Sequence, residues 1–133
     1  MSPSLPPLRP RVKRAVLIAD DEPSMRLLVT ATLTSDQITV LEAADGDAAW
    51  KTIQQHRPDL VLLDVQMPGL SGIELTARIR TNPELACIKI VILTSKAQAT
   101  DVASGLAAGA DLYLTKPFSP ISLLQYVEQS LGV

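Results

Sequence analysis

The sequence has very few of the residues that build disulfide frameworks, metal clusters and membrane spans. It contains one cysteine, Cys87, which excludes both a disulfide framework and a cysteine-ligated metal cluster. No uninterrupted apolar stretch approaches the roughly 18 residues of a membrane-spanning helix. The basic start is not followed by the apolar segment that a secretory signal requires. We therefore expect a protein without a membrane span, located in the cytoplasm.

Charge is unevenly distributed along the 133 residues. The chain has 12 basic and 14 acidic residues, for a net charge of −2. The first 14 residues hold four of the bases, four prolines and no acid, which leaves eight bases against 14 acids, a balance of −6, for the remainder. We predict a flexible tail over residues 1–12 and a single domain over residues 13–133. A tail that touches nucleic acid or a membrane is the alternative, but four charges without aromatic residues favour a solvated tail.

Short runs rich in Val, Ile and Leu alternate with helical stretches along this domain. The predicted strands are residues 14–19, 38–43, 59–63, 88–93 and 111–115. The predicted helices are one opened by Pro23 and those at about residues 46–56, 71–80, 97–108 and 120–131. Five such repeats imply an α/β fold: a five-stranded parallel sheet in the order 2-1-3-4-5, flanked by five helices in the flavodoxin-like, doubly wound arrangement.

Polar residues recur at the carboxyl ends of these strands. Asp20 and Asp21 follow the first strand, and Asp64 ends the apolar run of the third. Thr94 ends the fourth strand and Lys116 follows the fifth. In the predicted order the first and third strands are neighbours at the switch point, where α/β proteins bind ligands. Taken singly, each residue has a structural explanation as a helix cap, a strand residue or a surface charge, but their coincidence at four strand ends favours one functional crevice.

The chemistry of such a crevice follows from its carboxylates. Three carboxylates held close together repel one another unless a cation joins them. Oxygen-only ligands suit a hard ion such as Mg²⁺ rather than zinc or copper. A carboxylate beside Mg²⁺ can act as a nucleophile toward phosphorus and become an acyl phosphate. Lys116 and the hydroxyl of Thr94 would then contact the phosphoryl oxygens, so these residues predict phosphoryl transfer to Asp64.

These motifs resemble those of the response regulator receiver domain, the phosphoacceptor module of two-component signalling, over nearly the whole chain. The matching segments are IADDEPSMR, LLDVQMPGLSG, VILTSKA and AGADLYLTKPF. The resemblance implies that Asp64 is the phosphorylated residue and that Lys116 contacts the phosphoryl group. It also implies that Mg²⁺ is bound by Asp64, by Asp21 directly, by Asp20 through water and by the backbone carbonyl of Gln66. Such a domain catalyses only its own phosphorylation and dephosphorylation.

The resemblance further implies a switch that responds to the phosphoryl group. Thr94 and Tyr113 would form the switch pair, and a cis peptide bond is expected before Pro117. Two positions depart from the common pattern of the family. Gln66 stands where Asn is frequent, and Lys96 stands where small or acidic residues also occur. We expect these two side chains to tune the lifetime of the phosphoryl group rather than to prevent its formation.

The implied partners are a phosphodonor and an output. The donor would be a sensor histidine kinase or a phosphotransfer protein, and the output partner is unknown. We expect the switch to act through an output surface formed by the predicted fourth helix, the fifth strand and the fifth helix. This surface would control the output partner, or it would form a homodimer. We expect no contact with a membrane and no direct binding of nucleic acid by this domain. The chain is either a stand-alone receiver or a fragment of a longer regulator.

The proposed output surface includes the predicted helix over residues 120–131. On this helix Ile121, Leu124 and Val127 can form the buried face. Leu123 and Tyr126 would then point outward beside Tyr113 and form an exposed apolar cluster. The alternative is that Leu123 and Tyr126 pack against neighbouring loops.

Several other residues have ordinary structural interpretations. We expect Cys87 to be a small core residue, Trp50 to be a packing residue and His56 to be a cation at the end of a helix. The first helix should bury one apolar face. The predicted members of that face are Met25, Leu28, Val29 and Leu33.

Two other classes of protein share part of this pattern. A flavodoxin-like binding protein has the same architecture, but its phosphate loop should offer Ser, Thr, Gly and backbone N–H groups, whereas DDEPS presents three acids. A phosphatase of the haloacid dehalogenase class also uses an aspartate nucleophile. Resemblance to that class requires a second aspartate two residues later, where this chain has Gln66. The sequence therefore favours a signalling module over both alternatives.

Overall fold

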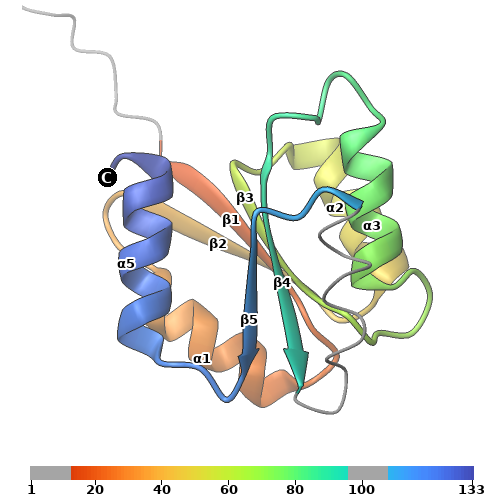
Figure 1. Cartoon of the computed structure of the whole chain (residues 1–133). Coiled ribbons are helices and arrows are strands. Elements are labelled where there is room, and N and C mark those ends of the chain that lie inside the picture. Colours follow the sequence, from red (N-terminus) through yellow and green to blue (C-terminus); the bar gives the residue numbers. More distant parts are fainter. Residues whose placement is uncertain (1–12, 96–107) are drawn as a thin grey trace, which may run out of the picture.

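A computed structural model of the chain, which describes residues 13–95 and 108–133, contains a five-stranded parallel sheet in the order β2-β1-β3-β4-β5 (Figure 1). The strand order and the fold class predicted from the sequence are confirmed. The strands are β1 (Arg14–Ala19), β2 (Ile38–Ala43), β3 (Leu60–Asp64), β4 (Lys89–Ser95) and β5 (Leu112–Lys116). The strands begin within one residue of their predicted positions, and β4 extends two residues further than predicted.

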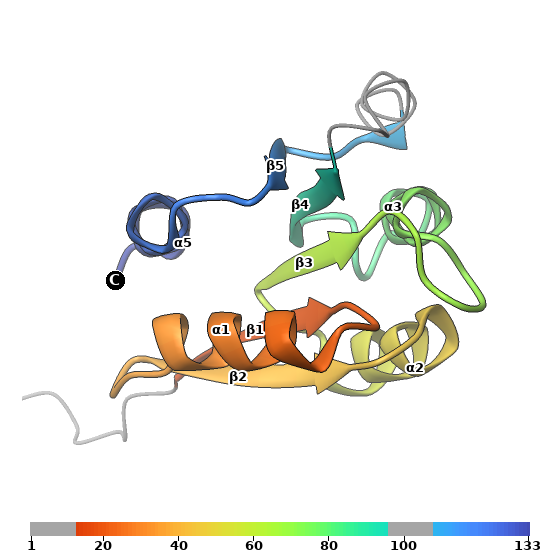
Figure 2. The same ribbon diagram turned by 90° about the horizontal axis from the view of Figure 1, so that it is seen from below.

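Four helices in the described part of the chain cover both faces of the sheet. They are α1 (Pro23–Leu33), α2 (Gly46–His56), α3 (Gly72–Arg80) and α5 (Pro120–Leu131). Helices α1 and α5 lie on one face and α2 and α3 on the other, as the view from below shows (Figure 2). Nearly all of the helix predicted over residues 97–108 lies outside the described residues. No helix in the described residues is both long enough and apolar enough to cross a membrane.

The sheet is buried on both faces, and this explains the composition of its central strands. All five residues of β3 are buried, and the side chains of Leu60, Val61, Leu62 and Leu63 alternate between the two apolar layers. One layer packs beneath α2 and α3 and the other beneath α1 and α5. A strand in this position must be apolar throughout, because neither face meets water. Asp64 is the residue at which β3 leaves this apolar environment.

Local signals set the helix boundaries. Pro23 occupies the first turn of α1, and the Asp45 side chain caps α2 by accepting a hydrogen bond from the Ala48 N–H at 2.7 Å. Ser71 and Glu74 form a reciprocal capping box at the start of α3. Because these signals are local, the predicted start of α1 and the predicted bounds of α2 and α5 agree with the structure.

The buried face of α5 differs from the prediction. Leu123 is buried, with 1% of its surface exposed, whereas Ile121 is 68% exposed. Val127 is buried as predicted, and Leu124 and Tyr126 are half-buried against the same apolar layer. The helix therefore turns toward the sheet the row that contains Leu123 and Val127, four residues apart. The predicted outward cluster of Leu123 and Tyr126 is wrong.

Two smaller predictions about buried residues are also wrong. Leu28 on α1 is 39% exposed, although Val29 and Leu33 are buried and Met25 packs against the core as expected. Cys87 is exposed and precedes β4. In that segment Leu85 and Ile88 supply the buried side chains, which leaves Cys87 facing solvent.

Candidate functional site

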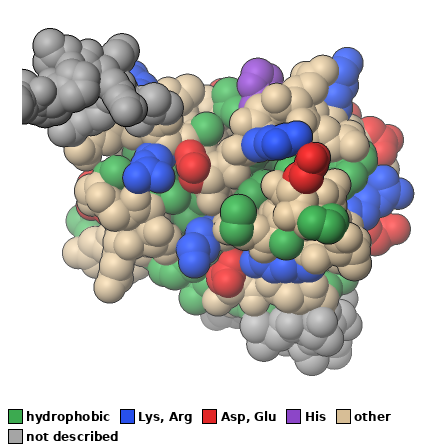
Figure 3. All heavy atoms as spheres, turned by 90° about the horizontal axis from the view of Figure 1, so that it is seen from above, with side chains coloured by type: hydrophobic (Ala, Val, Ile, Leu, Met, Phe, Trp, Pro, Cys, Tyr) green, Lys and Arg blue, Asp and Glu red, His purple; other side chains and the backbone are tan. Residues whose placement is uncertain are grey.

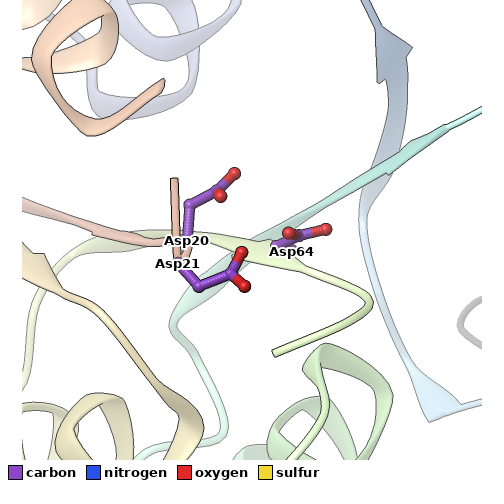
Figure 4. A group of neighbouring side chains, drawn as sticks. All are labelled: Asp20, Asp21 and Asp64. Carbon is purple, nitrogen blue, oxygen red and sulfur yellow. The ribbon is translucent and has the colours of Figure 1, made fainter. Parts of the chain in front are cut away.

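The carboxylates predicted to converge do so at the carboxyl edge of the sheet. Strands β1 and β3 are paired with Ala19 opposite Leu63, so Asp20 and Asp64 follow at adjacent positions. Asp20, Asp21 and Asp64 each offer an oxygen, and these three oxygens lie within 4.8 Å of one another. Figure 4 shows the three side chains directed into one space from the ends of the two strands. The strand order therefore brings together residues that are more than 40 positions apart in the chain.

These carboxylates differ in exposure. Asp20 is fully buried, Asp64 is 6% exposed, and Asp21 lies at the surface. Most polar side chains lie at the surface of a folded domain. In the described residues, three of the four buried polar side chains are Asp20, Asp64 and Thr94, and all three stand at this end of the sheet. The buried polar side chains of the described residues are therefore concentrated at the carboxyl end of the sheet.

Lys116 provides the positive charge of the cluster. Its Nζ donates to a carboxylate oxygen of Asp20 at 2.7 Å and lies 3.4 Å from carboxylate oxygens of both Asp64 and Glu22. The other oxygen of Asp20 accepts a hydrogen bond from the Glu22 N–H at 2.9 Å. Asp20 is therefore held in place by β5 and by its own chain, while Asp64 remains the less firmly held acid.

The local environment changes the proton affinity of two of these groups. Burial, and next the charge of Asp20, raise the pKa of Asp64 to about 6, although Lys116 and the backbone N–H of Gln66 act in the opposite direction. Burial by itself lowers the pKa of Lys116. The hydrogen bond to Asp20 and the charges of Asp64 and Asp20 outweigh burial, so the pKa of Lys116 lies above its usual value. Perturbed carboxyl and ammonium groups in a pocket are typical of a reactive centre.

The pocket around these groups is closed on one side by the loop between β3 and α3. Val65, Gln66, Met67 and Pro68 line it, together with Ser71 and Ser95. The N–H of Gly46 at the start of α2 donates to the Pro68 carbonyl at 2.9 Å. A Cβ on Gly46 would come within 1.9 Å of the Leu70 carbonyl oxygen, so only glycine permits this approach. Helix α2 thus fixes the loop that carries Gln66.

The predicted switch residues stand on the two strands beside the site. Thr94 is buried in β4, and its hydroxyl donates to the Ser95 carbonyl at 3.2 Å. Tyr113 in β5 is half-buried and packs against the apolar layer beneath α3. The peptide bond between Lys116 and Pro117 is cis, as predicted. Lys96, the second residue expected to tune the lifetime, lies outside the described residues.

Comparison with known protein families identifies the family of this chain. The model for the response regulator receiver domain matches residues 16–128. The chain is a response regulator receiver domain. Its membership of that family decides against the flavin-binding and phosphatase alternatives.

Named relatives and solved structures agree with this assignment. The receiver domain is 40% identical over 113 residues to the phosphate regulon transcriptional regulatory protein PhoB of Pseudomonas aeruginosa, a match to 85% of this chain and 49% of the relative. It is 35% identical over 120 residues to response regulator GtcR of Aneurinibacillus migulanus, a match to 90% of this chain and 48% of that protein. The chain thus spans about half the length of these curated relatives.

Two solved structures show the same fold over nearly their whole length. The chemotaxis response regulator CheY4 of Vibrio cholerae is 33% identical with a TM-score of 0.81, and the match covers 90% of this chain and 99% of CheY4. The receiver domain of Francisella response regulator 1452 is 29% identical with a TM-score of 0.80, covering 90% of this chain and 98% of that domain.

The donor set of the receiver domain fits a magnesium ion. Asp20, Asp21 and Asp64 supply only oxygen ligands within one small space, and Mg²⁺ is bound in proteins by one or two carboxylates while it keeps several waters. In the described residues no histidine joins this group, and the single cysteine is at the surface elsewhere. The composition of the site therefore suits a hard cation and does not suit zinc or copper.

Two residues near the site were missed from the sequence. Glu22 contacts Lys116, and the guanidinium of Arg26 donates to the Asp20 carbonyl at 2.7 Å while its Nε lies 3.3 Å from Glu42. Both residues belong to the segment DDEPSMR, so their closeness to Asp20 in the chain was a usable signal. Their partners Lys116 and Glu42 come from other strands, and only the assembled sheet reveals the contacts.

Proposed function

We propose that Asp64 is the phosphoacceptor of this receiver domain and takes a phosphoryl group from a histidine kinase or a phosphotransfer protein. The observation that carries the proposal is the position of Asp64: a buried carboxylate at a strand end, beside two further acids and 3.4 Å from Lys116. This arrangement offers a nucleophile, a cation for the phosphoryl oxygens and an oxygen-rich site for a metal.

Each residue of the site would have its own role in the transfer of the phosphoryl group. A carboxylate oxygen of Asp64 bonds to phosphorus while the bond from phosphorus to the donor breaks. Lys116 is held close to Asp64 and supplies positive charge to the oxygens of the transferred group. Mg²⁺, held by Asp20, Asp21 and Asp64 with the carbonyl of Gln66, would supply further charge neutralisation when bound. We propose that the hydroxyl of Thr94, a buried residue on the neighbouring strand β4, donates to a phosphoryl oxygen.

Phosphorylation in turn would bias a conformational equilibrium. We propose that Thr94 and Tyr113 respond together, because they lie on adjacent paired strands, β4 and β5, at the edge of the site. The surface built from residues 97–108, β5 and α5 would carry this change to an output protein or to a second copy of the domain. With Leu123 buried, the contribution of α5 to that surface rests on its half-buried and exposed side chains. We further propose a cytoplasmic location, where a kinase could reach the domain.

The phosphoacceptor is tested by intact mass after incubation with acetyl phosphate and Mg²⁺. We expect the gain of one phosphoryl group in the wild type and none in Asp64→Asn or in the presence of EDTA. Asp36→Asn is a matched control, because Asp36 is an exposed acid at a distance from the pocket lining. A mass gain that survives Asp64→Asn or chelation would show that another residue accepts the group.

The proposed switch is tested by amide hydrogen exchange with and without beryllofluoride, which mimics a phosphoryl group on Asp64. We expect changed exchange in peptides that cover residues 97–115. If those peptides are unchanged while another surface responds, the proposed output surface is wrong.

A further inference from the structure

Glu22 immediately precedes α1 but does not behave as a capping residue. It is the N-cap of the helix, and its side chain makes no cap hydrogen bond. N-cap side chains usually accept a bond from the first turn. Here the carboxylate reaches the ammonium group of Lys116 instead, at 3.4 Å, while 60% of the Glu22 side chain remains exposed. The Glu22 side chain thus contacts a pocket residue instead of capping the helix.

The charge of Glu22 is in excess of what the metal site requires. Asp20, Asp21 and Asp64 form the group that could hold a cation, and Glu22 is not one of them. Glu22 nevertheless lines the same pocket, beside Asp21 and Lys116. Three carboxylates thus contact Lys116, those of Asp20, Glu22 and Asp64. Of these three, only that of Glu22 lies outside the group that could hold a cation. A negative charge in this place opposes the approach of an anion.

We propose that Glu22 is a specificity-determining residue that selects against free phosphodonors according to their negative charge. The inference rests on the proposed phosphorylation of Asp64. The carboxylate of Glu22 acts in two ways. It repels the donor at the mouth of the pocket, and it competes with the phosphoryl oxygens for Lys116. Both effects grow with the charge of the donor, so a small dianion should be disfavoured more than a monoanion.

Two small donors of different charge separate this effect from others. Acetyl phosphate is a dianion near neutral pH, and its transfer to Asp64 breaks the bond from phosphorus to the acetate oxygen and releases acetate. Phosphoramidate is a monoanion, and its transfer breaks the bond from phosphorus to nitrogen and releases ammonia. The same Asp64 oxygen forms the new bond in both reactions. The ratio of the two rate constants therefore reports charge selection and cancels changes in the nucleophile.

We expect Glu22→Gln to raise the ratio of the acetyl phosphate rate to the phosphoramidate rate about threefold, the factor that Coulomb's law gives for one unit charge at roughly 7 Å in water. Rates are followed by intact mass at Mg²⁺ concentrations that saturate each variant. The ratio in Glu22→Gln should approach the wild-type ratio at about 1 M salt, because the screening length is then about 3 Å. The substitution should not affect folding, since the Glu22 side chain is mostly exposed and makes no cap bond.

Two control variants assign the effect. Glu22→Asp keeps the negative charge and should retain the wild-type ratio. Glu42→Gln also removes one negative charge, in this case from the ion pair with Arg26. Because Glu42 does not line the pocket, this variant should also leave the ratio unchanged. If Glu22→Asp behaves like Glu22→Gln, the negative charge at this position does not set the ratio, and the inference is wrong.

The remaining outcomes are equally decisive. A wild-type ratio in Glu22→Gln, or equal acceleration with both donors, would overturn charge selection while leaving phosphorylation of Asp64 intact. If the wild type gains no phosphoryl group from either donor, the proposed function itself fails and this inference fails with it.

Discussion

The two ends of the sheet carry ionic clusters of different composition. At the carboxyl end, Lys116 contacts Asp20, Glu22 and Asp64, and Asp21 lies close to Asp20 and Asp64, so acids outnumber the base. Several of these groups are buried, and close like charges raise the free energy of the folded state. This end is therefore electrostatically unbalanced, and a bound cation would relieve it.

At the amino end of the sheet, the charges are balanced. The Arg80 guanidinium donates to the carbonyls of Ala86, Ile88 and Gly109 at 2.6 to 2.9 Å and pairs with Asp111 at 2.8 Å. One base meets one acid, and the remaining donors meet backbone acceptors. Figure 3, viewed from this end of the molecule, shows basic and acidic side chains interspersed. The difference indicates that the amino end is built for stability and the carboxyl end for reactivity.

The largest effect on stability is expected from Arg80→Ala. This substitution removes four charge-assisted hydrogen bonds that tie the end of α3 to the segments flanking β4 and β5, and we expect it to lower the free energy of unfolding by about 3 kcal/mol. Urea denaturation measures the change. The rate of Asp64 phosphorylation in the folded fraction should be unaffected.

Glu84→Ala is the matched control at the same end. Glu84 pairs with Arg57 at 3.1 Å, but both side chains are more than half exposed, so the loss should be below about 1 kcal/mol. Equal losses in Arg80→Ala and Glu84→Ala would refute the structural role of the Arg80 cluster.

At the carboxyl end of the sheet, removing a charge should raise the free energy of unfolding rather than lower it. Asp64 binds its proton more tightly in the folded protein, with a pKa of about 6 against an ordinary value of 3.8. A raised pKa contributes stability below the ordinary value, and that stability is lost as the pH rises through about 6. In the absence of Mg²⁺ we therefore expect Asp64→Asn to raise the free energy of unfolding by about 2 kcal/mol near pH 7.5.

The pH dependence distinguishes this explanation from a general packing effect. The advantage of Asp64→Asn should shrink as the pH falls from about 6 toward 4, because the wild-type carboxyl group then becomes protonated. Denaturation at several pH values, with EDTA present, measures it. A gain that is independent of pH would mean that the charge of Asp64 is not its source.

The excess of acids also predicts how the site binds metal. Asp21→Ala removes one carboxylate from the cluster, and we expect Mg²⁺ affinity to fall at least tenfold, about 1.4 kcal/mol. Isothermal titration calorimetry measures the affinity directly. Asp36→Ala removes an exposed acid remote from the pocket lining and should leave it unchanged. Equal affinity in wild type and Asp21→Ala would remove Asp21 from the ligands.

The smallest effect concerns the lifetime of the phosphoryl group. Gln66 lines the pocket two residues after Asp64, and Lys96, outside the described residues, follows Thr94 by the same interval. We expect Gln66→Asn and Lys96→Ala each to change the dephosphorylation half-life several-fold, roughly 1 kcal/mol of barrier. Loss of label from the purified phosphoprotein gives the half-life. An unchanged half-life in both variants would show that neither side chain reaches the attacking water.

Much of the fold was predictable because its signals are local. The apolar run that ends at Asp64 marked a strand buried on both faces, and Pro23 marked the start of a helix. The site followed from the same reasoning, since parallel strands bring their carboxyl ends to one edge and Asp20 and Asp64 stand at two of them.

The faces of the helices were less predictable. Helix α5 carries apolar residues on more than one side, so periodicity alone allowed either Ile121 or Leu123 to face the sheet. The packing of α5 beside α1 selected Leu123. The exposure of Cys87 has a similar origin, because its neighbours Leu85 and Ile88 fill the available core.

The sequence by itself determined the order of strands and helices and the residues that stand at the strand ends, because both depend on composition over a few neighbouring positions. Only the tertiary structure decided which charges meet. Lys116 contacts Asp20 and Glu22 across more than 90 residues, and Arg80 reaches Gly109 and Asp111 across about 30. Such contacts depend on side-chain reach and on the relative placement of separate strands, neither of which is encoded in a local pattern of residue types.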